Sequence, residues 1–199
     1  GDPTAMTPSA DNVGVEAMGL VQVLNDPRSS LAQSLHALRT AELSDGVGWE
    51  TLIALAQDYP GLVFYGEWLV PHSLKTYRDD AWRNLYIFDV LSRSNGNFLH
   101  FDAYSPLLKS FGVDFVPCMG VGQNPTYDVL CGWRDRNTYL LQDGKGFGEG
   151  IVVKQYGWKN RFGRTTWAKL LKEPHYGAPW QLCESGDLRS GNVVIVSAG

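Results

Sequence analysis

The stretch GFGEGIVVKQYG, from Gly146 to Gly157, decides the fold prediction. A glycine-rich run ends in one acid, Glu149, and leads into a short β-branched segment that Lys154 closes. β-Branched residues favour strands, so this segment predicts a buried strand with a carboxylate at one end and an ammonium at the other. That arrangement suits a site for a polyanion and its metal ion.

The standard nucleotide and hydrolase motifs do not account for this stretch. It lacks the GK[ST] ending of a P-loop, and it leads into a strand where a dinucleotide fingerprint leads into a helix. The chain has no GxSxG, and its four histidines have no metal-ligand spacing. These histidines are therefore interpreted as structural or exposed.

Hydrophobic periodicity predicts an alternation of helices and strands along the rest of the chain. Helices are expected at 26–43 and 48–61. Within 105–117 the pattern predicts a short helix, capped by Gly112, that runs into a strand. For 126–143 the pattern favours a helix over a strand. Strands are expected at 62–70, 84–92, 150–157 and 165–172, and the tail at 180–199 predicts a β-hairpin. The pattern indicates an α+β fold with a large, mostly antiparallel sheet system flanked by helices.

The chain has 199 residues, which is enough for one domain with a sizeable core. The opening GDPTAM reads as an expression-vector remnant, and residues 1–12 are expected to be this remnant and a flexible lead-in. Residues 13–199 are then predicted to form a single domain.

The cysteines and the apolar segments indicate the cellular compartment. Three cysteines without a CxxC pair argue against a disulfide framework and a cysteine zinc site, and fit a reducing, cytoplasmic compartment. No apolar run approaches the length of a membrane span, and there is no signal-peptide pattern, so no membrane partner is expected.

The net charge of −4 gives no global attraction to nucleic acid, so any such contact needs a local patch. The candidate is KQYGWKNRFGR, which interleaves Lys159, Arg161 and Arg164 with aromatic residues. Basic and aromatic side chains together suit phosphate contact and base stacking. The alternative is a solvated basic hairpin tip.

Four segments, in order, resemble motifs III, IIIa, IV and V of the covalent nucleotidyltransferases, the superfamily of ATP-dependent RNA ligases, DNA ligases and mRNA capping enzymes. They are FYGEWLVPH (64–72), YIFDVL (86–91), GEGIVVK (148–154) and WAKLLK (167–172). The GEW form of the first motif and the text from 98 to 117 are more similar to the RNA ligase branch than to capping guanylyltransferases. The resemblance covers roughly residues 62–172 and implies the ligase adenylation fold.

These enzymes attack the α-phosphate of ATP with a lysine and hold AMP as a phosphoramidate. The transfer needs cations and a metal around the phosphates, and an aromatic face for adenine. The resemblance therefore implies ATP and Mg²⁺ as cofactors. It assigns the ribose or metal shell to Glu67, adenine stacking to Phe88, Mg²⁺ to Glu149, and the phosphates to Lys154, Lys169 and Lys172.

Each of these residues also has a structural alternative. Phe88 could be a core aromatic, and the charged residues could be ordinary surface or strand-end groups. The family's fifth motif usually carries lysines two apart, whereas here Leu171 stands two after Lys169 and the next lysine is Lys172. Either the register shifts by one residue or one phosphate contact is lost.

The family's KxDG motif, which carries the nucleophilic lysine, is absent from this sequence. No lysine precedes Lys75, which already follows Glu67, so the nucleophile is unknown. One hypothesis is that the tail hairpin at 180–197 takes the place of the missing hairpin, as in a circular permutation, with Ser185 near the position of the lysine.

Two functional classes remain open. The chain is either an RNA ligase-like enzyme that binds ATP and Mg²⁺ and joins or senses RNA ends, or a catalytically inactive relative that acts as a nucleotide-binding, nucleic-acid-binding or assembly module. The expected partners are a nucleotide and RNA or a nicked nucleic acid. The sequence does not define the oligomeric state.

Overall fold

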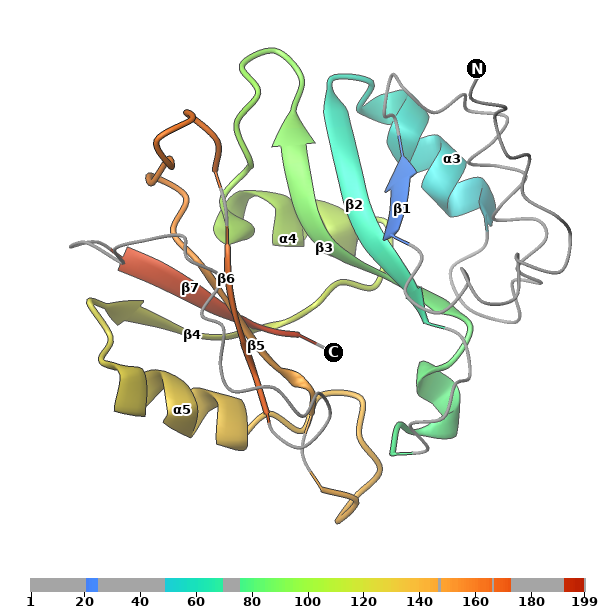
Figure 1. Ribbon diagram of the computed structural model, residues 1–199. Helices are drawn as coiled ribbons and strands as arrows, with labels where there is room; N and C mark the ends of the chain where they lie inside the picture. Colours follow the sequence, from blue (N-terminus) through green and yellow to red (C-terminus); the bar gives the residue numbers. More distant parts are fainter. Residues whose placement is uncertain are drawn as a thin grey trace, which may run out of the picture.

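The computed structural model describes residues 21–24, 49–69, 76–146, 148–165, 167–172 and 192–198 (Figure 1). The predicted lead-in at 1–12 and the predicted helix at 26–43 lie outside these residues. Within them, no helix is both long and apolar enough to cross a membrane.

The first sheet has three antiparallel strands in the order β1-β2-β3. Its strands are β1 (Val21–Leu24), β2 (Leu62–Leu69) and β3 (Asn84–Ser92), and the short 3-10 helix η1 (Asp79–Ala81) lies between β2 and β3. Side chains alternate between the two faces of β3, and a bulge between Ile87 and Asp89, where Phe88 has no partner on β2, shifts this alternation by one residue. Ile87 and Val90 point into a core under the helices, whereas Tyr86 and Phe88 point to the opposite side.

Two helices cover one face of this sheet. Helix α3 (Trp49–Asp58) contributes Leu52 and Leu55 to the core, and α4 (Phe101–Ser110) contributes Tyr104 and Leu108. The prediction for α3 is confirmed. Helix α4 begins four residues before its predicted start, because Pro106 lies inside the helix and not at its beginning.

The segment after α4 differs from the predicted helix-then-strand. Gly112 adopts a left-handed conformation with φ 67°, as expected for a residue that ends a helix. Phe115 then forms only an isolated bridge with Ile87, and the next strand, β4 (Cys118–Gln123), begins after Pro117.

The second sheet has four antiparallel strands in the order β4-β7-β5-β6. Its other strands are β5 (Gly150–Lys154), β6 (Ala168–Leu171) and β7 (Asn192–Ser197). Helix α5 (Tyr127–Asp135) packs Leu130 against the outer face of this sheet, beside Ile151 and Ile195. The prediction of a helix is confirmed for 127–135, while 136–143 forms turns.

The two sheets face each other across a shared core (Figure 1). Helices α3 and α4 cover the outer face of the first sheet, and α5 covers the outer face of the second. Tyr86 from β3 and Val194 and Val196 from β7 belong to this shared core. The result is the predicted α+β fold of antiparallel sheets flanked by helices.

The C-terminal strand lies in the middle of the second sheet. β7 pairs with β4 along one edge and with β5 along the other. Residues 180–191, which include Ser185 and the other half of the predicted hairpin, lie outside the described residues. The hairpin and the permutation therefore stay predictions.

Candidate functional site

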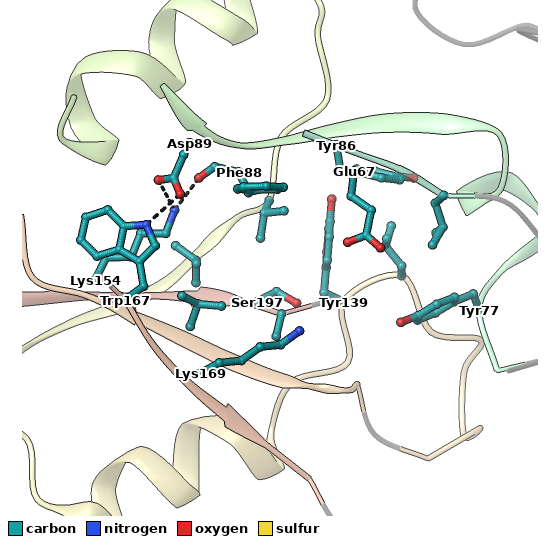
Figure 2. Close-up of a pocket in the computed structure, with 16 residues that line it drawn as sticks. Glu67, Tyr77, Tyr86, Phe88, Asp89, Tyr139, Lys154, Trp167, Lys169 and Ser197 are labelled. Carbon is teal, nitrogen blue, oxygen red and sulfur yellow. Dashed lines mark hydrogen bonds and ion pairs between the residues drawn. The ribbon is translucent and has the colours of Figure 1, made fainter. Parts of the chain in front are cut away.

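A cavity of about 340 Å³ opens between the two sheets (Figure 2). Both sheets and the segment between α5 and β5 contribute to its walls. The lining residues are Glu67, Leu69, Tyr77, Tyr86, Phe88, Asp89, Val116, Tyr139, Leu140, Val152, Lys154, Trp167, Lys169, Val196, Ser197 and Ala198.

Aromatic rings form much of the wall. Phe88 projects from β3 over the cavity, and Tyr86 and Tyr139 meet edge to face with ring centroids 6.0 Å apart (Figure 2). Tyr77 lies at the other end, where its ring contacts Trp82 at 5.2 Å. Because aromatic faces favour planar ligands, this wall can hold a heterocyclic base.

One group of polar side chains lies on the side of the cavity near Tyr77, away from Asp89 and Lys154. Figure 2 shows the carboxylate of Glu67 and the ammonium of Lys169 directed toward the same space. Glu149 joins them at the rim, since Tyr77 donates a hydrogen bond to its Oε1 at 3.4 Å and Lys169 Nζ lies 3.9 Å from its Oε2. The structure therefore brings together Glu67, Glu149 and Lys169, which the sequence predicted from three separate motifs.

The carboxylates allow a test of the implied magnesium ion. The described residues contain no group of three or more histidine, cysteine or acidic side chains that could hold a metal alone. Mg²⁺ in nucleotide sites commonly takes one or two carboxylates, and water and phosphate oxygens complete its shell. Glu149 and Glu67 fit that smaller requirement, so the site suits a metal that arrives with a nucleotide.

Lys154 has a different environment from the one predicted. Its ammonium is 2.7 Å from Asp89 Oδ1 and also donates to the carbonyl oxygen of Phe88. Trp167 Nε1 donates to Asp89 Oδ2 at 2.8 Å (Figure 2). The side chains of Lys154 and Asp89 are only 1% and 5% exposed. Lys154 was predicted to face phosphates, yet its charge is already matched inside the protein.

Burial acts on both members of this pair. Desolvation raises the pKa of Asp89 and lowers the pKa of Lys154, and the charge of each partner opposes that effect on the other. The two hydrogen bonds that Asp89 accepts favour its ionised form. The pair joins β3 of the first sheet to β5 of the second, so it fixes the distance between the two walls of the cavity.

Lys172 is not among the residues that line the cavity. Its backbone N–H donates to the carbonyl oxygen of Glu149 at 2.8 Å, and the charges acting on its ammonium belong to Arg134 and Asp135 of α5. Lys169 is the lysine of this strand that reaches the cavity, with Leu171 two positions on. The two alternatives for the motif, a shifted register and a lost phosphate contact, both stay open.

The predicted nucleic-acid patch lies outside the cavity, in the connection between β5 and β6. Arg161 and Arg164 are exposed there. Lys159 Nζ donates to Asn97 Oδ1 at 3.1 Å, so its ammonium holds the loop against the end of β3.

Several cavity residues were not predicted. The sequence contains a signal for Asp89, because this residue is the one acid within the apolar strand YIFDVL. Tyr77 and Tyr139 had no such signal, because Tyr77 lies between the predicted elements and Tyr139 falls in the last part of the predicted helix at 126–143, which the structure shows as turns. Ser197 is held at the cavity by buried Asn137, whose side-chain amide donates to Ser197 Oγ at 2.9 Å. The same amide donates to the carbonyl oxygen of Gly150 at 2.7 Å, so Asn137 connects the end of β7 to the start of β5.

The comparison with family models shows the class of protein to which this fold belongs. The model of the RNA ligase family matches residues 9–171. The chain belongs to the RNA ligase family.

Other comparisons add little. A stretch of 35 residues is 51% identical to the potassium-transporting ATPase ATP-binding subunit of Dechloromonas aromatica (strain RCB). It spans 18% of this chain and only 5% of that protein, so it carries no argument about function. No solved structure matches the chain significantly.

Proposed function

We propose that this RNA ligase family domain binds an adenine nucleotide with Mg²⁺ in the cavity between its two sheets, and that it joins or senses RNA ends. The observation that carries the proposal is the meeting of Glu67, Phe88 and Lys169 at one aromatic cavity, with Glu149 at its rim. Those residues come from four motifs that are distant in sequence.

The aromatic wall and the charged end suggest the orientation of the nucleotide. The base stacks on Phe88, and the ribose lies toward Glu67. The phosphates extend to Lys169, whose ammonium is half exposed and therefore available to a ligand. Glu149 then holds the metal, which supplies positive charge to the phosphate oxygens when it is bound.

A non-covalent binder is the second candidate function. Self-adenylation needs a lysine with a free amine at the α-phosphate, and the sequence contains no KxDG. Among the described cavity residues the lysines are Lys154 and Lys169, and Lys154 is held by Asp89. These observations favour nucleotide binding without transfer unless Lys169 or a residue outside the described ranges serves as the nucleophile.

Thermal unfolding with and without Mg²⁺-ATP tests the binding site. A ligand that binds only the folded state stabilises it, by about 2.7 kcal/mol at a hundredfold excess over Kd. Mg²⁺-ATP should raise the melting temperature, and Glu149→Ala should reduce that shift strongly. Asp143→Ala, which removes an exposed acid from the same connecting segment, is the matched control. A full shift in the Glu149 variant would show that the site is assigned wrongly.

Intact-mass measurement after incubation with ATP and Mg²⁺ separates the two candidate functions. A gain of one AMP, lost in Lys169→Arg, would identify an adenylating enzyme that uses Lys169. An unchanged mass together with a nucleotide-dependent thermal shift would identify the non-covalent binder. An active RNA ligase treated in parallel is the positive control.

A further inference from the structure

The loop from 155 to 165, between β5 and β6, carries the most exposed large hydrophobic side chain of the described residues. Phe162 is 70% exposed. The guanidinium of Arg161 lies over its ring, 4.8 Å from the centroid. Leaving an aromatic ring in water is unfavourable, and an arginine beside it adds a cation to the same surface. An exposed aromatic face beside a cation can stack on an unpaired base and contact its phosphate.

The tip of the loop has a fixed conformation. Asn160 Oδ1 accepts hydrogen bonds from the backbone N–H groups of Phe162 at 2.9 Å and Arg164 at 3.0 Å. Asn160 N donates to the carbonyl oxygen of Arg164 at 2.8 Å, and Gly163 takes the left-handed conformation that closes the turn. Phe162 is therefore displayed on an ordered turn, which lowers the entropic cost of binding to it.

The root of the loop is attached to the wall of the cavity. Tyr156 packs against Trp167 with centroids 5.1 Å apart, and Trp167 packs against Phe98 at 5.3 Å. The hydrogen bond from Lys159 to Asn97 adds a second attachment. Since Trp167 also lines the cavity, packed aromatic rings connect the root of the loop to the cavity wall.

The loop is positively charged although the chain is acidic. Residues 155–165 contain Lys159, Arg161 and Arg164 and no acid, whereas the whole chain has a net charge of −4. The field that attracts a polyanion is therefore local to this loop. A lipid surface would be favoured by several exposed apolar side chains, but here one aromatic ring stands among cations.

We propose that this tip is a stacking platform for single-stranded RNA, in which an unpaired base stacks on Phe162 and neighbouring phosphates contact Arg161 and Arg164. Lys159 is a positioning residue that holds the loop. Single-stranded nucleic acids bind through this combination of aromatic stacking and phosphate neutralisation. The inference rests on the proposed function only in choosing RNA as the polymer, because the tip does not depend on the cavity holding a nucleotide.

Fluorescence anisotropy with a labelled single-stranded RNA 12-mer of mixed sequence tests the platform. Phe162→Ala should weaken binding by about 5- to 150-fold, the range measured for loss of one base–aromatic stack. Phe162→Tyr keeps an aromatic face and should bind like the native protein. Arg164→Ala should reduce the slope of log K against log salt by about 0.7, the value for one phosphate of a single strand.

Val121→Ala is the matched control, because it removes an exposed apolar side chain, 65% exposed, from β4 instead of the loop. Its affinity should be unchanged. Equal affinity of the Phe162→Ala and native proteins would overturn the proposal, as would binding too weak to detect with the native protein. Retained binding to a duplex of the same sequence, with no effect of Phe162, would show that charge alone attracts the nucleic acid.

The thermal shift with Mg²⁺-ATP separates this proposal from the proposed function. Phe162→Ala should keep the full shift, because the tip lies outside the cavity lining. RNA binding that depends on Phe162, in a protein with no nucleotide shift, would support the platform and contradict the cavity assignment. A nucleotide shift in a protein whose RNA binding does not depend on Phe162 would support the cavity assignment and contradict the platform.

Discussion

At the scale of single residues, the buried pair of Lys154 and Asp89 is the interaction with the largest expected effect on stability. Replacing Lys154 by methionine leaves the Asp89 carboxylate in the core with Trp167 as its remaining side-chain partner. Breaking a buried ion pair at one end costs roughly 3–5 kcal/mol. We expect Lys154→Met to lower the free energy of unfolding by about that amount in urea titrations.

The double variant with Asp89→Asn distinguishes a structural pair from a phosphate contact. Its loss of stability should be smaller than the sum of the two single losses, because no unpaired charge remains. Lys145→Met, at an exposed lysine, is the control and should change stability by less than about 0.5 kcal/mol. If Lys154→Met were neutral for stability and abolished the nucleotide-dependent shift, Lys154 would serve the phosphates after all.

This pair also shows what residue-level sequence reasoning can find. The motif predicted that Lys154 is a phosphate-binding cation, and the structure places it in the cavity wall with its ammonium paired to Asp89. The partner could not be found, because Asp89 is 65 residues away and only the packing of β3 against β5 brings them together. Burial depends on such long-range packing. The sequence alone therefore does not distinguish a lysine that binds a ligand from a lysine that pairs with a buried acid.

At the scale of elements, strand β5 depends on the glycine at its start. A Cβ added to Gly150 would lie 2.2 Å from the carbonyl oxygen of Leu170 on β6, which is backbone and cannot move aside alone. Gly150→Ala should therefore separate the two strands and lower stability by about 1–3 kcal/mol or more. It should also weaken the nucleotide-dependent shift, since Glu149 directly precedes Gly150 and Lys169 pairs with Val152 in the same two strands.

Gly157→Ala provides the comparison for this prediction. Gly157 is in the loop after the same strand and has no atoms within 4 Å of an added Cβ. Its melting temperature should stay close to that of the native protein. Equal melting temperatures of the two alanine variants would mean that the strands tolerate the wider spacing.

The individual elements were largely predictable, whereas their arrangement was not. Local patterns found α3, α5 and the strands β2, β3, β5 and β6, because helix and strand periodicity depend on neighbouring residues. The place of β7 between β4 and β5 joins segments that are distant along the chain. The tail sequence NVVIV predicts a strand, but no local feature states which partners it takes.

At the scale of the whole molecule, the space between the two sheets is the feature on which the proposed function depends. Val152 projects from β5 into this cavity of about 340 Å³. Val152→Phe would fill part of it with an apolar ring. We expect the unliganded melting temperature to stay the same or rise, because cavity-filling substitutions commonly add about 0.5–2 kcal/mol. The Mg²⁺-ATP shift should disappear, because the base and the new ring would occupy the same volume.

Val152→Ala gives the opposite change at the same position. It enlarges the cavity, so the unliganded protein should be less stable, while room for the nucleotide remains and the shift should persist. The two variants thus move stability and binding in opposite directions, which a general loss of folding cannot reproduce. A nucleotide shift that survived Val152→Phe would place the ligand outside the space between the sheets.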